Sequence, residues 1–338
     1  MLTPAYKLTI GRQVVDSTQE PRASTLVDLR VELDLDTPAD GFTLVLGNVG
    51  SLTAAKGDDV AIDLGYADDG GLERVMVGTV TAVDANLTTT RVTGVSGASS
   101  LLALFVEESF EAKTAGAITR DLAGRAAPAV EVARAEDGIL FPVYVVDGRR
   151  SAWHHLGDLA DLSGFDLYVG PDGKLVFERF AGGRTAHVFE VGKHVLALDV
   201  LRTPPRASRV EAWGESPTAS AGDDAASWLT RDFSGSRGAS GSGPLLLLER
   251  PALRTRTAAA TAALAALTTL ERRTLRGRLT VLGRAQVHLG DAIHLKGHAD
   301  DSLNTVFQVR SVTHRLTKAA GFTTAIGFRS IAVPGASA

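Results

Sequence analysis

The chain has 338 residues, of which 44% are hydrophobic, and a formal net charge of −4 at pH 7. It contains no cysteine, which excludes disulfides, thiolate zinc sites, iron–sulfur clusters and a cysteine nucleophile. The charges are interspersed and no stretch is uniformly apolar over ~20 residues, so neither nucleic-acid binding nor membrane insertion is expected. The opening stretch MLTPAYKLTIGRQVV is typical of a strand and not of a signal peptide.

Residues 1–100 are predicted to form a β-barrel or sandwich. Six apolar-alternating segments are separated by turns rich in Asp, Gly and Pro, as expected of a β-meander. They are YKLTI, LVDLRVELDL, FTLVLGN, DVAIDLGY, ERVMVGTVTAVD and TTTRVTGVSG. The predicted fold class of the whole chain is therefore α+β and mainly β, with two tube-like β-barrels and a small α/β module between them.

Residues 101–182 are predicted to form that α/β module. Thr114 is placed to cap a helix that carries Ile118 and Leu122, and a VYVV strand follows. Ser151 is then placed to cap a second helix over residues 152–163. Next, FDLYVGPDGKLVFER alternates on both sides of a Gly-Pro-Asp-Gly turn, which predicts a β-hairpin.

The second helix carries a candidate surface. On a helical wheel His154, Asp158 and Asp161 lie opposite the apolar stripe, and His154 and Asp158 have the i,i+4 spacing of a weak surface pair. The adjacent His154 and His155 point about 100° apart, which does not suit one zinc ion. We therefore predict a solvated or partner-facing helix surface in preference to a catalytic or metal site.

Residues 183–338 are predicted to form the second β-barrel, beginning with AHVFEV, VLALDVLR and ASRVEAWG. Residues 215–243 are so rich in Ser, Gly and Ala that a long flexible loop is expected, in which Trp228 and Phe233 could serve as anchors. An Ala-rich helix is predicted over residues 255–273. Its expected core stripe consists of Leu264, Leu267 and Leu270.

Two segments far apart in the chain resemble each other. GDDVAIDLGYADD begins at Gly57 and Asp58, and GDAIHLKGHADD begins at Gly290 and Asp291. Each is followed at a similar distance by a V-x-x-V strand and then by a strand that starts with Thr-Thr. Either β-proteins simply reuse such turns and strands, or the chain contains two related barrels with the α/β module inserted between them.

Motifs of common enzymes are missing from the sequence. There is no Gly-x-x-x-x-Gly-Lys-Ser/Thr loop and no Gly-x-Ser-x-Gly elbow, although two distant carboxylates could still meet as in a glycosidase. Four histidines near the end are explained by strand alternation better than by metal binding; they are His288, His294, His298 and His314. We predict no catalytic residue, no cofactor and no metal.

The order of several blocks resembles a known family. SFEAKTAGAITRDLAGRA, SAWHHLGDLADLSGFDLYVGPDGKLVFER, LGDAIHLKG, VRSVTH and GFTTAIGF together resemble the late control protein D family of contractile-tailed phages, over residues 1 to about 332. These are baseplate hub proteins, similar also to the N-terminal hub portion of valine-glycine-repeat spike proteins of type VI secretion. The resemblance implies a homotrimer with two tube-like barrels per chain, which adapts a hexameric inner tube to a trimeric spike.

The resemblance also implies partners and a location. The expected partners are further copies of the chain, an inner tube or tube-initiator protein, other baseplate proteins and a separate spike protein, because only IAVPGASA follows the second barrel. The protein would assemble in the bacterial cytoplasm and then belong to a phage tail or a contractile injection particle. Rival hypotheses are a tail-tip cell-wall hydrolase and a carbohydrate-binding tail protein. An aromatic content of 6% argues against the second.

Overall fold

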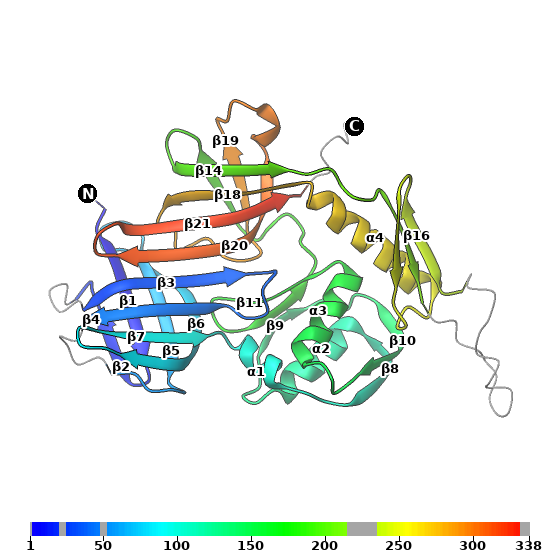
Figure 1. Ribbon diagram of the computed structural model, residues 1–338, viewed down its shortest axis with the longest axis horizontal. Coiled ribbons are helices and arrows are strands. Elements are labelled where there is room, and N and C mark those ends of the chain that lie inside the picture. The colour runs from blue at the N-terminus through cyan, green and yellow to red at the C-terminus, as the bar shows by residue number, and fades with distance from the viewer. Residues whose placement is uncertain (1, 20–24, 48–52, 215–234, 332–338) are drawn as a thin grey trace.

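The protein has a mainly β fold with four α-helices in the part described, which confirms the predicted fold class. The computed structural model describes residues 2–19, 25–47, 53–214 and 235–331. Figure 1 shows long strands stacked on one side of the molecule, with the helices gathered on the other. Within the described residues, no helix has both the length and the apolar character needed to cross a membrane.

The first β unit contains the strands predicted before residue 100. Their order in the sheet is β3-β4-β7-β6-β5-β1-β2, and all neighbours are antiparallel. Buried and more exposed residues alternate along β3 and β4, so that one face of these strands is buried. The strands are β1 (Pro4–Ile10), β2 (Gln13–Asp16), β3 (Leu26–Asp34), β4 (Gly41–Gly47), β5 (Asp59–Tyr66), β6 (Gly71–Ala85) and β7 (Thr89–Val95).

The second β unit lies near the end of the chain. Its strand order is β14-β18-β21-β20-β19-β13, and only the β13–β19 pair is parallel. A short 3-10 helix, η2 (Asp301–Leu303), connects β19 to β20. The strands are β13 (Ala186–Glu190), β14 (Val195–Arg202), β18 (Leu275–Leu282), β19 (Ala292–Lys296), β20 (Val306–Thr317) and β21 (Gly321–Ser330).

The two β units form one continuous sheet. The second half of β20, residues 311–317, pairs antiparallel with β3, which joins the units into 13 strands. An ion pair of 2.9 Å between Arg315 Nη2 and Asp28 Oδ2 crosses this junction. The buried apolar side chains of both units belong to a single cluster, so they stabilise each other as parts of one core.

The central α/β module contains the predicted hairpin and one of the two predicted caps; Ser151 stands at the N-cap of the helix over residues 152–163, but its side chain accepts no capping hydrogen bond. The Thr114 hydroxyl accepts a hydrogen bond of 3.1 Å from Ala117 N at the start of α2, and β11 pairs antiparallel with β12 around the Gly-Pro-Asp-Gly turn. The elements are α1 (Ala98–Ala103), β8 (Glu108–Thr114), α2 (Ala115–Arg125), β9 (Val132–Ala135), β10 (Leu140–Val146), α3 (Ala152–Ser163), β11 (Asp166–Val169) and β12 (Leu175–Glu178).

The expected flexible loop over residues 215–243 is wrong at its C-terminal end. β16 (Arg237–Gly241) lies there and pairs with β15 (Arg209–Trp213), which also pairs with β17 (Leu245–Glu249). A Cβ at Gly238 would overlap the backbone of α4 (Arg256–Arg272), so the small residues that suggested a loop permit close packing instead. Trp228 and Phe233 lie outside the described residues.

The Ala-rich helix is present as α4, but its expected leucine stripe is wrong at Leu264; Leu267 and Leu270 pack against the core. Leu264 is 55% exposed, whereas Leu267 is buried. The helix approaches its neighbours closely because most of its buried residues are alanines: Ala258, Ala259, Ala262, Ala263 and Ala265. The first four share a core with α2 and α3, so α4 packs with the central module and not with the second β unit. The expectation that residues 183–338 form a single barrel is therefore wrong at α4 and at β15, β16 and β17, which form a separate sheet.

Candidate partner-facing surface

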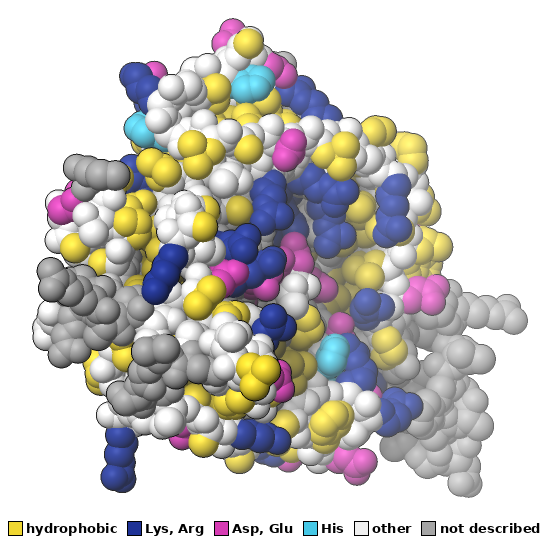
Figure 2. Space-filling model, turned by 60° about the vertical axis from the view of Figure 1, so that its left-hand side comes forward, with side chains coloured by type: hydrophobic (Ala, Val, Ile, Leu, Met, Phe, Trp, Pro, Cys, Tyr) yellow, Lys and Arg dark blue, Asp and Glu magenta, His cyan; other side chains and the backbone are white. Residues whose placement is uncertain are grey.

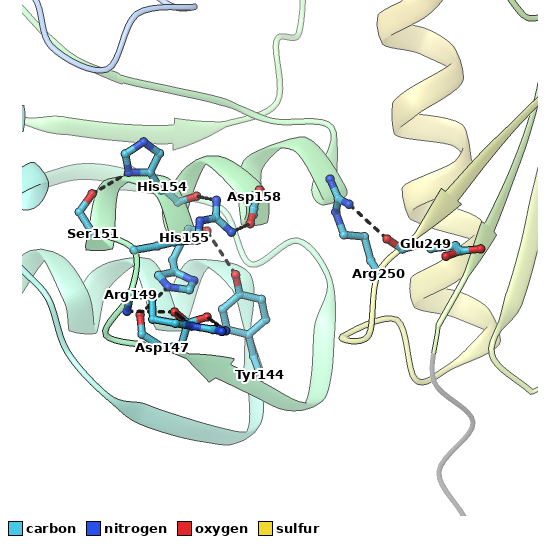
Figure 3. Close-up of polar contacts among 10 residues, drawn as sticks. Tyr144, Asp147, Arg149, Ser151, His154, His155, Asp158, Glu249 and Arg250 are labelled. Atoms are coloured by element: carbon cyan, nitrogen blue, oxygen red, sulfur yellow. Dashed lines mark hydrogen bonds and ion pairs between the residues drawn. The ribbon is translucent and has the colours of Figure 1, made fainter. Parts of the chain in front are cut away.

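The candidate surface is built on α3, which begins and ends where the sequence predicts. Gly164 ends the helix with the left-handed φ of 70° that favours glycine. Trp153, Leu156 and Leu159 are buried on one side, where they pack in the core of the central module. The opposite side faces solvent and carries the polar residues (Figure 3).

The expected pairing of His154 with Asp158 is wrong. The Nη1 atom of Arg150 lies 2.6 Å from Asp158 Oδ2, so an arginine from the preceding turn binds the carboxylate. His154 is exposed, and its Nδ1 lies 2.8 Å from the hydroxyl of Ser151 (Figure 3). A guanidinium can bind a carboxylate through a planar pair of N–H donors, which an imidazole lacks, and this explains the exchange of partners.

The Ser151–His154 contact is a helix-terminal hydrogen bond and lacks the features of a nucleophile with its base. Ser151 is only 3% exposed, so a substrate has little access to its hydroxyl. In the part of the chain that is described, no carboxylate contacts the His154 ring to orient it, because Asp158 is bound to Arg150. A triad needs that third group as well as an accessible nucleophile.

His155 is a structural residue that the sequence argument did not single out. It is buried, its Nε2 donates a hydrogen bond of 3.1 Å to the carbonyl of Asp147, and its own carbonyl accepts one of 3.4 Å from the Tyr144 hydroxyl (Figure 3). Burial raises the pKa of Tyr144, which keeps the phenol neutral. On the helical wheel His155 lies about 40° from the buried Leu159, so helical periodicity places His155 on the buried side of the helix.

Next to this network lies a hollow of about 540 Å³. Tyr144, His155 and Asp158 line it together with Arg149, Arg150, Arg250 and Arg254. Asp147 is bound by Arg149 at 3.2 Å, and Arg250 donates to the carbonyl of Glu249 at 3.1 Å. Asp147 and Asp158 are thus bound by arginines of the same lining, which also contains apolar residues such as Val143 and Leu162.

Asp161 does not belong to that hollow. It lines a different one of about 320 Å³, on the side of α3 that faces the β units, together with Asp36, Arg273 and Arg310. The three predicted residues therefore lie in three places. His154 is exposed on the first turn of α3, Asp158 lines the hollow beside Tyr144, and Asp161 lines the second hollow. Sequence periodicity placed them all on the polar side of the helix but could not distinguish its two flanks.

The repeated Gly-Asp turns have the same internal geometry. Gly57 and Gly290 have φ values of 93° and 81°, which favour glycine. Asp58 Oδ2 accepts a hydrogen bond of 2.8 Å from the backbone N–H three residues earlier, and Asp291 Oδ2 accepts one of 3.0 Å from the same relative position. The carbonyl of Asp58 accepts a hydrogen bond of 2.9 Å from Val80 N on β6, and that of Asp291 accepts one of 3.0 Å from Val309 N on β20.

Of the C-terminal histidines, His288 and His314 interact electrostatically, whereas His298 forms a hydrogen bond within its own turn. His314 is fully buried, with Nδ1 3.1 Å from Thr324 Oγ1, and burial lowers its pKa to about 3. Burial also lowers the pKa of His288, while His298 Nδ1 accepts a hydrogen bond from Asp300 N. Among the described residues, no three His, Asp or Glu side chains are grouped so as to hold a metal ion.

Comparisons with known proteins identify the fold. No protein-family model matches the chain, and no curated protein matches it in sequence. Two phage-type tail proteins have the same fold throughout. The 43 kDa tail protein of prophage MuSo2 from Shewanella oneidensis matches 96% of this chain and 98% of its own at 15% identity, with a TM-score of 0.70. A tail protein from Neisseria meningitidis matches 98% of both chains at 14% identity, also with a TM-score of 0.70.

A third similar structure comes from a secretion system. It is an E. coli component of the type VI secretion system that itself resembles the T4 bacteriophage tail proteins gp27 and gp5. It matches 97% of this chain and 80% of its own at 10% identity, with a TM-score of 0.62. The fold is thus shared with phage tail proteins and with a type VI secretion component, as the resemblance in sequence implied.

Proposed function

We propose that the protein is the structural baseplate hub of a contractile tail or phage-derived injection system, a homotrimer that adapts a hexameric inner tube to a trimeric spike. The observation that carries this proposal is the repetition of five strands in one order. The first unit has β3-β4-β7-β6-β5, and the second has β14-β18-β21-β20-β19. Two equivalent units per chain supply six in a trimer, which suits a sixfold partner.

Matching irregularities support the equivalence of the two units. The β6–β7 register shifts between Val80 and Ala82, and the β20–β21 register shifts between Val309 and Ser311. A second shift bypasses Val27 on β3 and Leu196 on β14, each at the corresponding place in its strand. Bulges depend on local backbone geometry, so their recurrence at equivalent positions argues for repeated units rather than two unrelated sheets.

The junction inside the chain offers a template for the contact between chains. β3 pairs with the second half of β20, and the equivalent elements are β14 and the second half of β6. Among the described residues, β14 pairs only with β18 apart from a single bridge between Val195 and Val191, and residues 82–85 of β6 pair only with β7. Pairing β14 of one copy with β6 of the next would satisfy both edges and close a ring.

This ring has a defined register that cysteine cross-linking tests. His314 pairs with Val31 at the internal junction, and their equivalents are Ala85 and Val200. The natural chain has no cysteine, so the pair Ala85→Cys and Val200→Cys should give an intermolecular disulfide and a covalent trimer in assembled particles. The control pair Ala85→Cys and Leu196→Cys lies four residues out of register and should remain uncross-linked. Equal cross-linking of both pairs would contradict the proposed ring.

The hub proposal includes partners and excludes catalysis. The partners would be the tube or tube-initiator protein, the spike and other baseplate proteins, with assembly in the bacterial cytoplasm before incorporation into the particle. A reconstruction of the particle without imposed symmetry should contain three copies of the chain at the tube–spike transition. The purified protein should also fail to clear a suspension of bacterial cell walls. Six copies in the ring, or clearing of the walls, would each overturn the corresponding part of the proposal.

A further inference from the structure

A cluster of arginines lies on the outer face of the second β unit. Arg276 and Arg278 alternate along β18 with the buried Leu275 and Leu279, so they point away from the core. Arg329 on β21 pairs directly with Arg276 in the register of the sheet. Cross-strand neighbours on one face lie close together, so this pairing brings like charges side by side.

These arginines line a hollow of about 670 Å³, here called the arginine groove. Its wall contains five arginines and two aspartates among other residues. The five are Arg273, Arg276, Arg278, Arg310 and Arg329, and the two are Asp36 and Asp199. Figure 2 shows basic side chains gathered around a hollow in the surface, with acidic side chains within it. The charges lining the groove are thus in excess by three positive units.

The two carboxylates of the groove do not balance this charge: Asp36 is already bound by two arginines, and Asp199 lies opposite Arg278 in the β14–β18 register. Asp36 accepts from both Arg310 Nη2 at 2.6 Å and Arg329 Nη2 at 2.7 Å. Within the described residues, Arg273, Arg276 and Arg278 form no ion pair. Burial, and secondarily the charge of Arg310, lowers the pKa of Arg329 to about 10, as expected where cations crowd together.

The other residues of the groove restrict what it could bind. The side chain of Leu201 is half exposed at the rim, next to Val200, and gives the groove an apolar wall beside the guanidiniums. Asp36 and Asp199 would repel a continuous phosphate backbone, because such a chain carries a charge on every unit. A peptide that alternates acidic and apolar side chains avoids that repulsion and fills the apolar wall.

We propose that the arginine groove binds a short acidic segment of a protein partner, with two of its carboxylates on Arg276 and Arg278 and an apolar side chain against Leu201. Guanidinium groups bind carboxylates in a bidentate geometry, which makes such contacts both strong and specific. This inference concerns one surface of a single chain and does not depend on the trimer or on the hub function.

Fluorescence anisotropy with a labelled peptide of alternating Glu and Leu tests the proposal on the full chain. At low ionic strength the peptide should bind, and Arg276→Gln with Arg278→Gln should weaken binding at least tenfold. The matched control, Arg30→Gln with Arg91→Gln, removes two arginines from the outer face of the first unit and should change binding less than twofold. The same peptide with Gln in place of Glu should bind at least tenfold more weakly.

Three results would overturn the proposal. They are equal weakening by the groove and control variants, equal affinity for a thymidine oligonucleotide of the same charge, and displacement of the peptide by an equal concentration of inorganic phosphate. If the Gln variant does not fold, Arg276→Lys with Arg278→Lys retains the charge but removes the planar fork. It should still weaken binding about threefold or more, and unchanged affinity would equally contradict the inference.

Discussion

The ring of Phe42 occupies the space that a side chain on Gly94 would need, directly across the β4–β7 pair. At the equivalent place in the second unit, Phe328 of β21 fills the space above Gly277 of β18. The two residue types have exchanged strands. Each unit therefore has one phenyl ring opposite one glycine at this place. The total side-chain volume of the pair is the same in both units, although the strand that carries the ring differs.

Adding a methyl group to Gly94 or Gly277 should therefore destabilise the protein. In each case the Cβ would collide with both a phenyl ring and a backbone carbonyl, which costs about 1–3 kcal/mol of unfolding free energy. Gly124→Ala on α2 is the control, since a Cβ there meets nothing within 4 Å and should stabilise the helix by up to about 1 kcal/mol. Urea unfolding measures all three, and equal effects at Gly94 and Gly124 would refute the packing argument.

The polar side of α3 should contribute little to stability. His154→Ala combined with Asp158→Ala removes an exposed imidazole and a partly exposed ion pair with Arg150, so the unfolding free energy should fall by less than about 1 kcal/mol. His155→Ala should cost more, on the order of 2 kcal/mol, because it leaves a cavity and removes the hydrogen bond to Asp147. A larger loss for the double variant than for His155→Ala would contradict this assignment.

Acid should destabilise the fold through His314. Burial holds its pKa at about 3, against an ordinary value of 6.5, so between these values the unfolded chain takes up a proton that the folded one does not. Its stabilising contribution is complete above pH 6.5 and is lost as the pH falls toward 3. His314→Leu should reduce the slope of unfolding free energy against pH in this range by up to about 1.4 kcal/mol per pH unit. An unchanged slope would show that His314 is not the group responsible.

Asp40 should have the opposite pH dependence. Burial raises its pKa to about 7, so the folded state retains a proton that the unfolded state releases above 3.8, and stability falls as the pH rises from 3.8 to 7. Asp40→Asn keeps an acceptor for the 2.8 Å hydrogen bond from Asp34 N and cannot ionise. The variant should therefore gain stability relative to the natural protein between pH 5 and pH 8. Melting temperatures at the two pH values test this, and a constant difference between the proteins would refute it.

Local patterns predicted the parts of this structure that local chemistry determines. Strand alternation located strands of both units, but it placed β15 in the second unit, whereas β15 pairs with β16 and β17 in a separate sheet. Thr114 and Gly164 marked helix ends because their roles depend only on near neighbours. The strand β16 was not predicted because its Gly/Ser/Ala composition is typical of loops. The reason for its small residues is visible only in the structure, where α4 packs closely against Gly238. The arginine groove could not be predicted for a related reason, since Arg276 and Arg329 are brought together only by the pairing of β18 with β21.

The pairing of β3 with β20 also has a consequence for synthesis on the ribosome. About 280 residues separate the end of β3 from the end of β20. At a translation rate of about 5–20 residues per second, β20 is therefore completed roughly 15–60 s after β3. During that interval the backbone groups of β3 that later bond to β20 are open to strands of other nascent chains. Asp28, Arg30 and Glu32 lie on that edge, and their charges protect it from aggregation until translation reaches the final strands.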